Sequence, residues 1–215
     1  MLIAVVVVVG IVFAQRALTS PRYRTVVADP VDPSGDPVQI DIQSGDPIPI
    51  SFKDGEAELV PKAKYRMAAK VCGRKKYSQP WQALVAPYDL CLSWGRLATE
   101  DMKGKVKFSQ DMRWYQFRIQ PDTSFDVDYV QKHSSNTHII YADANLKKAV
   151  RRIGRGDEVE MTGYLVYIKG KYKGHDVWWN SSLRRDDGGD GACEVFYITS
   201  LRKGKRLYGT PTEVE

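Results

Sequence analysis

The chain has 215 residues, of which 43% are hydrophobic and 11% aromatic, a composition that excludes wholesale disorder and allows one compact core. The formal net charge is +6, but residues 25–60 carry eight acids and one base. Residues 61–215 carry 28 bases and 18 acids. A basic folded part favours anionic lipid, nucleic acid or acidic polymers as partners. Charges scattered for solubility are the alternative, since no run of five like charges occurs.

Residues 2–14 read LIAVVVVVGIVFA, thirteen apolar residues without a charge. Such a run is shorter than the roughly 20 residues that span a bilayer, yet long enough for the core of a signal peptide. We therefore expect residues 1–18 to be an N-terminal membrane anchor or a signal segment, with a buried segment as the third alternative. The first bases follow the run, which favours a cytoplasmic domain. A start site assigned too far downstream would restore the usual orientation, with the domain in the periplasm, and this is our expectation.

Residues 19–48 are acidic and proline-rich, with four Asp-Pro pairs beginning at Asp29, Asp32, Asp36 and Asp46. Proline removes a backbone donor and pushes the preceding residue into an extended conformation. Acidic stretches with few aromatic residues seldom form a core. We expect a semi-extended tether over residues 19–48, a folded domain over 49–209 and a short C-terminal tail over 210–215.

Within residues 49–209, short apolar runs alternate with turn signals, and Asp54-Gly55 predicts the turn of a first hairpin. Residues 105–109 and 113–119 predict a second hairpin with its turn at Gln110-Asp111. Residues 143–153 predict a helix, because Asp143 can cap an apolar stripe that ends before a glycine. Strands are predicted at 64–72 and at 158–169, where Gly163 interrupts the alternation. We expect a mainly β (α+β) domain, a small closed or partly open OB-like β-barrel with one helix between strands.

Two histidines, His133 and His138, lie five residues apart in a polar segment that also contains Asn136. They could ligate a metal or act as acid and base. Their spacing does not match helical ligand pairs, and no third ligand lies nearby in the sequence. The alternative is a loop whose polar side chains bond the backbone and fix the turn. We predict no metal and no cofactor.

The segment 181–194 combines three Asp with three Gly, but it lacks the ligand spacing of a calcium-binding EF-hand loop and reads as a hairpin turn. Asp186 and Cys193 from this segment, together with His133 and His138, are the candidates for a hydrolase site. A small buried residue is the alternative for Cys193. Arg184 is a candidate binding residue.

Cys72 and Cys91 could form a disulfide in an oxidising compartment, while reduced thiols fit equally well. The three cysteines contain no CxxC pair, which leaves a structural zinc site without support. Among the aromatic residues, Trp114 lies in a strand with alternating aromatic and polar residues. Trp178 and Trp179 are adjacent, so one indole should point to each face of their strand and one should lie outside the main core.

From about residue 60 onward, several motifs together resemble an uncharacterised family of proteobacterial single-span envelope proteins: LSWGRL (92–97), FSQDMRWYQFRI (108–119), HSSNTHIIYAD (133–143), RIGRGDEVEMTGYLV (152–166) and SSLRRDDGGDGACEV (181–195). The chain departs from that pattern at Tyr141, where the family has proline. The resemblance implies a short anchor, a proline-rich spacer, one compact domain and the bacterial inner membrane. It implies no reaction.

These observations predict a non-catalytic, membrane-anchored envelope module that docks on a partner protein or an anionic polymer. Its enzymatic status is left open, leaning towards none. A hydrolase built on the His, Cys and Asp candidates is one alternative, and an OB-like nucleic-acid binder is another if the domain is cytoplasmic. We expect nucleic acid to be the less favoured partner, and the sequence leaves the oligomeric state undetermined.

Overall fold

The structure is a computed structural model that describes residues 20–43, 45–99, 104–121, 123, 126–184 and 193–214. The protein is mainly β, with 52% of the described residues in strands and 12% in helices. Within the described ranges no helix is long and apolar enough to cross a membrane, and the apolar run at 2–14 lies outside these ranges.

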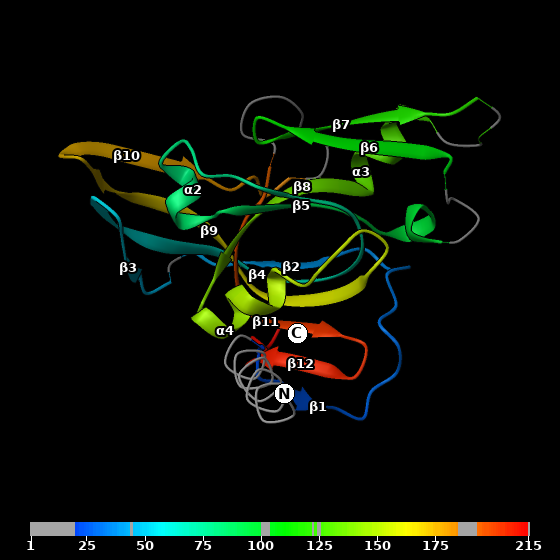
Figure 1. Ribbon diagram of the computed structural model, residues 1–215, viewed down its shortest axis with the longest axis horizontal. Helices are drawn as coiled ribbons and strands as arrows, with labels where there is room; N and C mark the ends of the chain where they lie inside the picture. Colours follow the sequence, from blue (N-terminus) through cyan, green and yellow to red (C-terminus); the bar gives the residue numbers. More distant parts are fainter. Residues whose placement is uncertain are drawn as a thin grey trace, which may run out of the picture.

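One large mixed sheet of ten strands forms the body of the molecule (Figure 1). Its hydrogen-bonded path runs β1-β12-β11-β8-β5-β4-β9-β10, and β2 and β3 pair with β4 off this path. The strands are β1 (Arg24–Thr25), β2 (Val38–Asp41), β3 (Ile48–Phe52), β4 (Gly55–Lys76), β5 (Tyr88–Ser93), β8 (Ser134–Tyr141), β9 (Glu158–Tyr172), β10 (His175–Asn180), β11 (Val195–Lys203) and β12 (Arg206–Gly209). The mainly β prediction is confirmed, but the sheet is much larger than the small barrel that we expected.

The central strands also pair in a cycle, because β11 contacts β9 as well as β8. β4 pairs with β5, β5 with β8, β8 with β11, β11 with β9, and β9 with β4. All of these pairings are antiparallel except that of β8 with β11. The side chains enclosed by these strands form the largest hydrophobic cluster, which includes Tyr65, Met67, Leu90, Leu92, Ile139, Leu165 and Phe196.

A separate two-stranded sheet, formed by β6 (Val106–Asp111) and β7 (Trp114–Ile119), lies over β5 and β8 (Figure 1). The predicted hairpin is confirmed, but its turn lies at Met112 and Arg113, two residues later than expected. Both of these residues have positive φ, 47° and 72°. This left-handed pair is the backbone of a type I′ turn, which Asn-Gly usually signals. Met-Arg carries no such signal, so the sequence pointed to the wrong turn.

The described helical elements are α2 (Gln82–Val85), α3 (Val127–Lys132), α4 (Ala144–Val150) and the 3₁₀ turn η1 (Gly95–Ala98). The predicted helix is confirmed as α4, since the Asp143 side chain accepts a 2.7 Å hydrogen bond from the Leu146 N–H. Our expectation of one helix was wrong. The short helix α3 was overlooked, although Asp126 caps it in the same way by accepting from Tyr129 N–H at 2.6 Å.

The stretch predicted as a tether contributes two strands to the sheet. β1 pairs with β12 and β2 pairs with β4. Between them, the Asp36 carboxylate accepts a 3.1 Å hydrogen bond from the Trp94 indole, and Val31 is buried. At β1, β2, Val31 and Asp36 the stretch therefore contacts the folded domain, which a free tether would not do.

Gly163 marks a place where strands approach too closely for a side chain. A Cβ on Gly163 in β9 would lie 2.0 Å from the Tyr197 carbonyl oxygen, and its φ is +156°. Gly163 pairs with Tyr65 of β4 on one side and with Ile198 of β11 on the other, next to a bulge in β11. The glycine that interrupts the predicted alternation is thus the point where β9 bends between two neighbours.

We predict that Gly163→Ala lowers the free energy of unfolding by about 2 kcal/mol or more, because the new methyl group would meet backbone on β11. Gly154→Ala is the matched control, since a Cβ there meets nothing within 4 Å. It should change stability by less than about 0.5 kcal/mol. Urea unfolding of the two variants tests this, and equal stabilities would contradict the role of Gly163.

Candidate functional site

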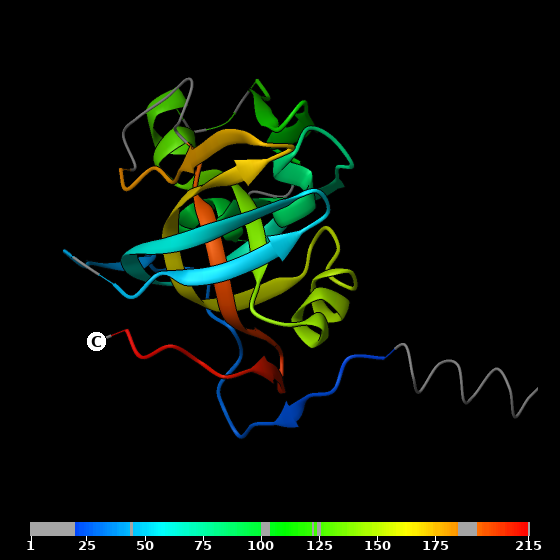
Figure 2. The same ribbon diagram turned by 90° about the vertical axis from the view of Figure 1, so that its left-hand side faces the viewer.

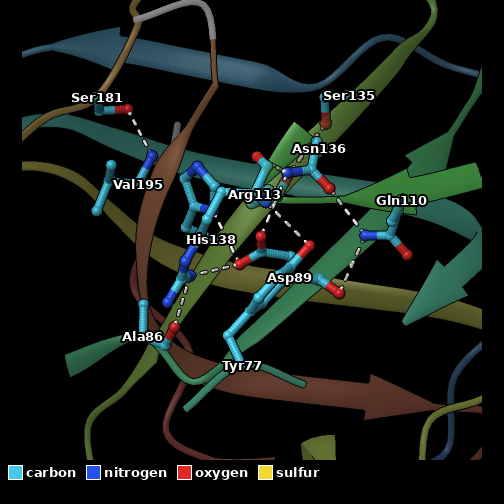
Figure 3. Close-up of polar contacts among 11 residues, drawn as sticks. Tyr77, Ala86, Asp89, Gln110, Arg113, Ser135, Asn136, His138, Ser181 and Val195 are labelled. Carbon is cyan, nitrogen blue, oxygen red and sulfur yellow. Dashed lines mark hydrogen bonds and ion pairs between the residues drawn. The ribbon is translucent and has the colours of Figure 1, made fainter. Parts of the chain in front are cut away.

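A buried ionic cluster lies between the main sheet and the β6–β7 hairpin (Figure 3). Its centre is Asp89 of β5, whose side chain is completely buried. One carboxylate oxygen, Oδ1, accepts from His138 Nδ1 at 2.8 Å and from an Arg113 guanidinium nitrogen at 2.8 Å. Because the carboxylate accepts, the Nδ1 atom of His138 carries the proton in this contact.

The strand register explains why these side chains meet. Asp89 of β5 is paired directly with His138 of β8, and Cys91 is paired with Asn136. Paired residues project from the same face of a sheet, so this face of β5 and β8 is polar. The intervening residues Leu90 and Leu92 point into the hydrophobic core.

The hairpin covers this polar face with matching groups. Gln110 donates to the Asn136 side-chain oxygen at 2.8 Å, and Asn136 donates to the Arg113 carbonyl oxygen at 2.9 Å. The Tyr115 hydroxyl lies 3.3 Å from the Ser134 carbonyl oxygen. Burial raises the pKa of Tyr115 to about 12. The predicted binding residue Asn136 is therefore 1% exposed and is used to hold the hairpin.

Arg113 projects from the hairpin turn into the cluster and was not predicted from the sequence. Its guanidinium donates to the Ala86 carbonyl oxygen at 2.9 Å as well as to Asp89. It also lies over the rings of Tyr77 and Trp179, at 4.6 and 5.6 Å from their centroids. The Nε and Nη2 atoms are buried without a hydrogen-bond partner in the described part of the chain. Aromatic faces therefore supply much of the environment of this cation.

The Asp89–His138 pair has the contact by which a carboxylate orients a catalytic imidazole. However, His138 is only 3% exposed and Asp89 is not exposed at all. The Ser181 hydroxyl, drawn beside the cluster in Figure 3, donates to the Ser182 carbonyl oxygen at 2.9 Å and accepts from Val195 N–H at 3.0 Å. The Asp89–His138 pair is therefore a polar contact buried in the core.

The two histidines do not converge. His133 caps the end of α3, where its ring stacks on Tyr129 at 3.8 Å and its Nδ1 lies 2.9 Å from the Tyr129 carbonyl oxygen. Its nearest carboxylate is that of Asp36, at 3.8 Å. His138 instead contacts Asp89 and Trp179. The joint site that we considered for His133 and His138 is not formed.

The structure places two of the three remaining candidates, the catalytic candidate Cys193 and the binding candidate Arg184. Cys193 precedes Glu194, whose carbonyl oxygen accepts from His138 N–H at 2.9 Å, so Cys193 and His138 lie in neighbouring segments. Arg184 is exposed, and its backbone N–H donates to the Ser182 hydroxyl at 3.0 Å. Asp186 lies outside the described residues, and its predicted role is untested. Within the described ranges, no three His, Cys, Asp or Glu side chains are grouped to hold a metal ion.

The adjacent tryptophans of β10 point to opposite faces, as the alternation predicts. Trp179 packs in a second hydrophobic cluster and stacks edge-on against Trp81 beside α2. Trp178 is 70% exposed. Trp114, on the hairpin, is 39% exposed.

Trp178 lies in an open groove of about 680 Å³ on the outer face of the sheet formed by β3, β4, β9 and β10. In Figure 2, β3 and β4 cross the front of the molecule, with the β9–β10 hairpin above them. One row of cross-strand partners in the groove is Pro49, Glu58, Lys169 and Trp178, and the next is Ser51, Glu56, Lys171 and Asp176. Lys169 and Glu58 form a 3.1 Å ion pair.

Comparison of the chain with protein-family models, with curated proteins and with solved structures gave no match. The family resemblance described above therefore stays a prediction.

We predict that Arg113→Ala lowers the free energy of unfolding by about 3–5 kcal/mol, because it leaves the fully buried Asp89 carboxylate without its cation. Lys75→Ala is the matched control. Lys75 joins the same hairpin to the main sheet through Asp111 at 2.6 Å, but the Lys75 side chain is 38% exposed and that of Asp111 is 79% exposed. Its loss should cost less than about 1 kcal/mol. Chemical denaturation measures both, and comparable losses would contradict the structural role of the buried pair.

Proposed function

We propose that this chain is a membrane-anchored, non-catalytic binding module that contacts its ligand through the groove containing Trp178. The exposed indole of Trp178 is the observation that carries the proposal. Tryptophan is highly buried on average, yet this side chain is 70% exposed beside Tyr167 in a groove of about 680 Å³. Exposed aromatic side chains in a concavity are characteristic of binding surfaces.

Binding is favoured over hydrolysis because of where the titratable groups lie. The best acid–base pair, Asp89 with His138, is buried beneath the hairpin and bonded to Arg113. A general base must come within hydrogen-bond reach of a substrate proton. The Trp178 groove is accessible instead, and charged or aromatic side chains are already arranged along it.

We further propose that β4, β5, β8, β9 and β11 form an OB-like unit. The cyclic pairing of these five strands, the parallel contact of β8 with β11 and the position of α4 between β8 and β9 support this assignment. OB domains bind ligands on the face of their second and third strands, here β5 and β8. That face is covered by the β6–β7 hairpin, so the open groove on β3, β4, β9 and β10 is the better candidate surface.

The charge of the groove points to an uncharged polar ligand. Three carboxylates, those of Glu56, Glu58 and Asp176, face two ammonium groups, those of Lys169 and Lys171. The net charge of the groove is therefore close to zero, whereas residues 61–215 carry a formal net charge of +10. A nearly neutral groove does not attract a polyanion. The anionic polymer and nucleic acid considered above are therefore less suited to this surface.

A glycan chain fits this combination of groups. The apolar face of a sugar ring packs on an exposed indole, and its hydroxyls exchange hydrogen bonds with carboxylates and ammonium groups. The open shape of the groove suits a chain that continues beyond both ends. A bacterial inner-membrane location, which the family resemblance implies, with the domain in the periplasm as we expect, would bring the groove near the glycans of the cell envelope.

We predict that the full chain in neutral detergent binds the β-1,4-linked hexamer of N-acetylglucosamine and that Trp178→Ala weakens binding at least about tenfold. Truncating a central tryptophan commonly costs about 2 kcal/mol or more, and a factor of ten is about 1.4 kcal/mol. Isothermal titration calorimetry measures the affinities. Trp114→Ala removes the same side chain from the hairpin and should leave binding unchanged.

Vesicles of phosphatidylglycerol and a single-stranded oligonucleotide serve as polyanionic probes in the same experiment. Preferential binding of either, lost on raising the salt concentration, would overturn the proposed ligand class. Equal loss of glycan binding in Trp114→Ala would overturn the assignment of the groove.

A further inference from the structure

Cys72 and Cys91 form a second chemical feature, remote from the Trp178 groove and independent of the proposed function. Cys72 lies in β4 and Cys91 in the adjacent strand β5. None of the three cysteines is in a disulfide. The predicted disulfide therefore stays a prediction. The geometry around the two thiols indicates in addition how such a bond could form.

A bulge in β4 brings the two thiols together. The register shifts between Val71, which pairs with Leu92, and Gly73, which pairs with Cys91. Cys72 is the extra residue, so Cys72 and Gly73 together oppose Cys91. The Cys72 sulfur lies 3.2 Å from the hydroxyl oxygen of Ser93. Ser93 and Cys91 are two residues apart in β5 and project from the same face, so the two thiols lie on the same side of the sheet.

The two thiols differ in accessibility. Cys91 is completely buried, whereas Cys72 is partly exposed and lines a groove of about 370 Å³ with Lys70, Phe108 and Arg155. Cys91 lines a neighbouring groove of about 450 Å³. Phe108 and Arg155 line both grooves, so the pair lies beneath β6. A small solute reaches Cys72 first.

The residues around the two thiols also shift their pKa values in opposite directions. The side chain of Cys91 lowers the pKa of Cys72, and the Ser93 hydroxyl at 3.2 Å and the cations of Arg155 and Lys70 act in the same direction. Burial raises the pKa of Cys91 well above its usual value. The thiolate is the nucleophilic form of cysteine. Cys72 is thus placed to act as the nucleophile towards an oxidant. Cys91 is placed to form a disulfide with the oxidised Cys72.

We propose that Cys72 and Cys91 are a reversible dithiol–disulfide site that reacts with hydroperoxides. The Cys72 thiolate attacks the outer peroxide oxygen and breaks the O–O bond, which gives a sulfenic acid and releases an alkoxide or hydroxide that takes up the proton lost by Cys72. The Cys91 sulfur then attacks the sulfenic sulfur, and the thiol proton leaves with the hydroxyl group as water. The dithiol loses two electrons, and the peroxide is reduced by two.

The test uses the reduced full chain in neutral detergent, treated with one equivalent of hydrogen peroxide, alkylated and digested for mass spectrometry. We expect one intramolecular Cys72–Cys91 disulfide with Cys193 still alkylated. Dithiothreitol should restore all three thiols. Cys193→Ser is the matched control and should form the same bond.

The two partner variants separate the steps. Cys91→Ser should stop at a sulfenic acid on Cys72, which dimedone traps, and Cys72→Ser should react with peroxide at least about tenfold more slowly. Circular dichroism checks the fold of each variant. If one variant unfolds, the products of the wild-type chain decide the proposal. A wild-type chain that accumulates a sulfinic acid on Cys72, that forms a bond to Cys193, or that keeps all three thiols would overturn the proposal.

Discussion

The length of β4 is the constraint on which the rest of the structure depends. This strand has 22 residues, which would extend roughly 70 Å if straight. It stays within one domain by bending at two register shifts, one between Pro61 and Ala63 and one between Val71 and Gly73. Its alternate residues from Ala57 to Val71 are buried, so each bend must keep the apolar face directed inward. The bends set the positions of both β5 and β9, and through them the two surfaces discussed above.

The face of the sheet near one end of β4 is covered, whereas the face near its other end is open to solvent. Near its C-terminal end, β4 and its partner β5 present polar side chains that the β6–β7 hairpin covers, with Arg113 bonded to Asp89. Near its N-terminal end, β4 lies between β3 and β9, and the outer face stays open around Trp178. One face is therefore used to hold the fold together, and the other is available to a ligand. The second bend also places Cys72 beside Cys91 under the edge of the hairpin.

Features of the fold that depend on short stretches of sequence were predicted. The Asp143 cap, the β3–β4 hairpin and the opposite directions of Trp178 and Trp179 each depend on a few neighbouring residues. The turn of that hairpin is Lys53-Asp54, one residue earlier than the predicted Asp54-Gly55, because Gly55 already pairs with Phe52. The cluster around Asp89 depends on three segments far apart in sequence, and Arg113 reaches it from a turn that lacks the usual Asn-Gly signal. One clue was present, because Asp89 is a lone charge in the apolar run YDLCLS. A charge inside a buried strand requires a partner, but the sequence does not identify that partner.

The most direct test of ligand binding at the open face is an NMR titration of the five tryptophan indole N–H signals in the full chain. On addition of the N-acetylglucosamine hexamer, we expect the Trp178 signal to shift and the signals of buried Trp94 and hairpin Trp114 to stay in place. A shift confined to Trp114, or five unchanged signals at saturating ligand, would contradict the account.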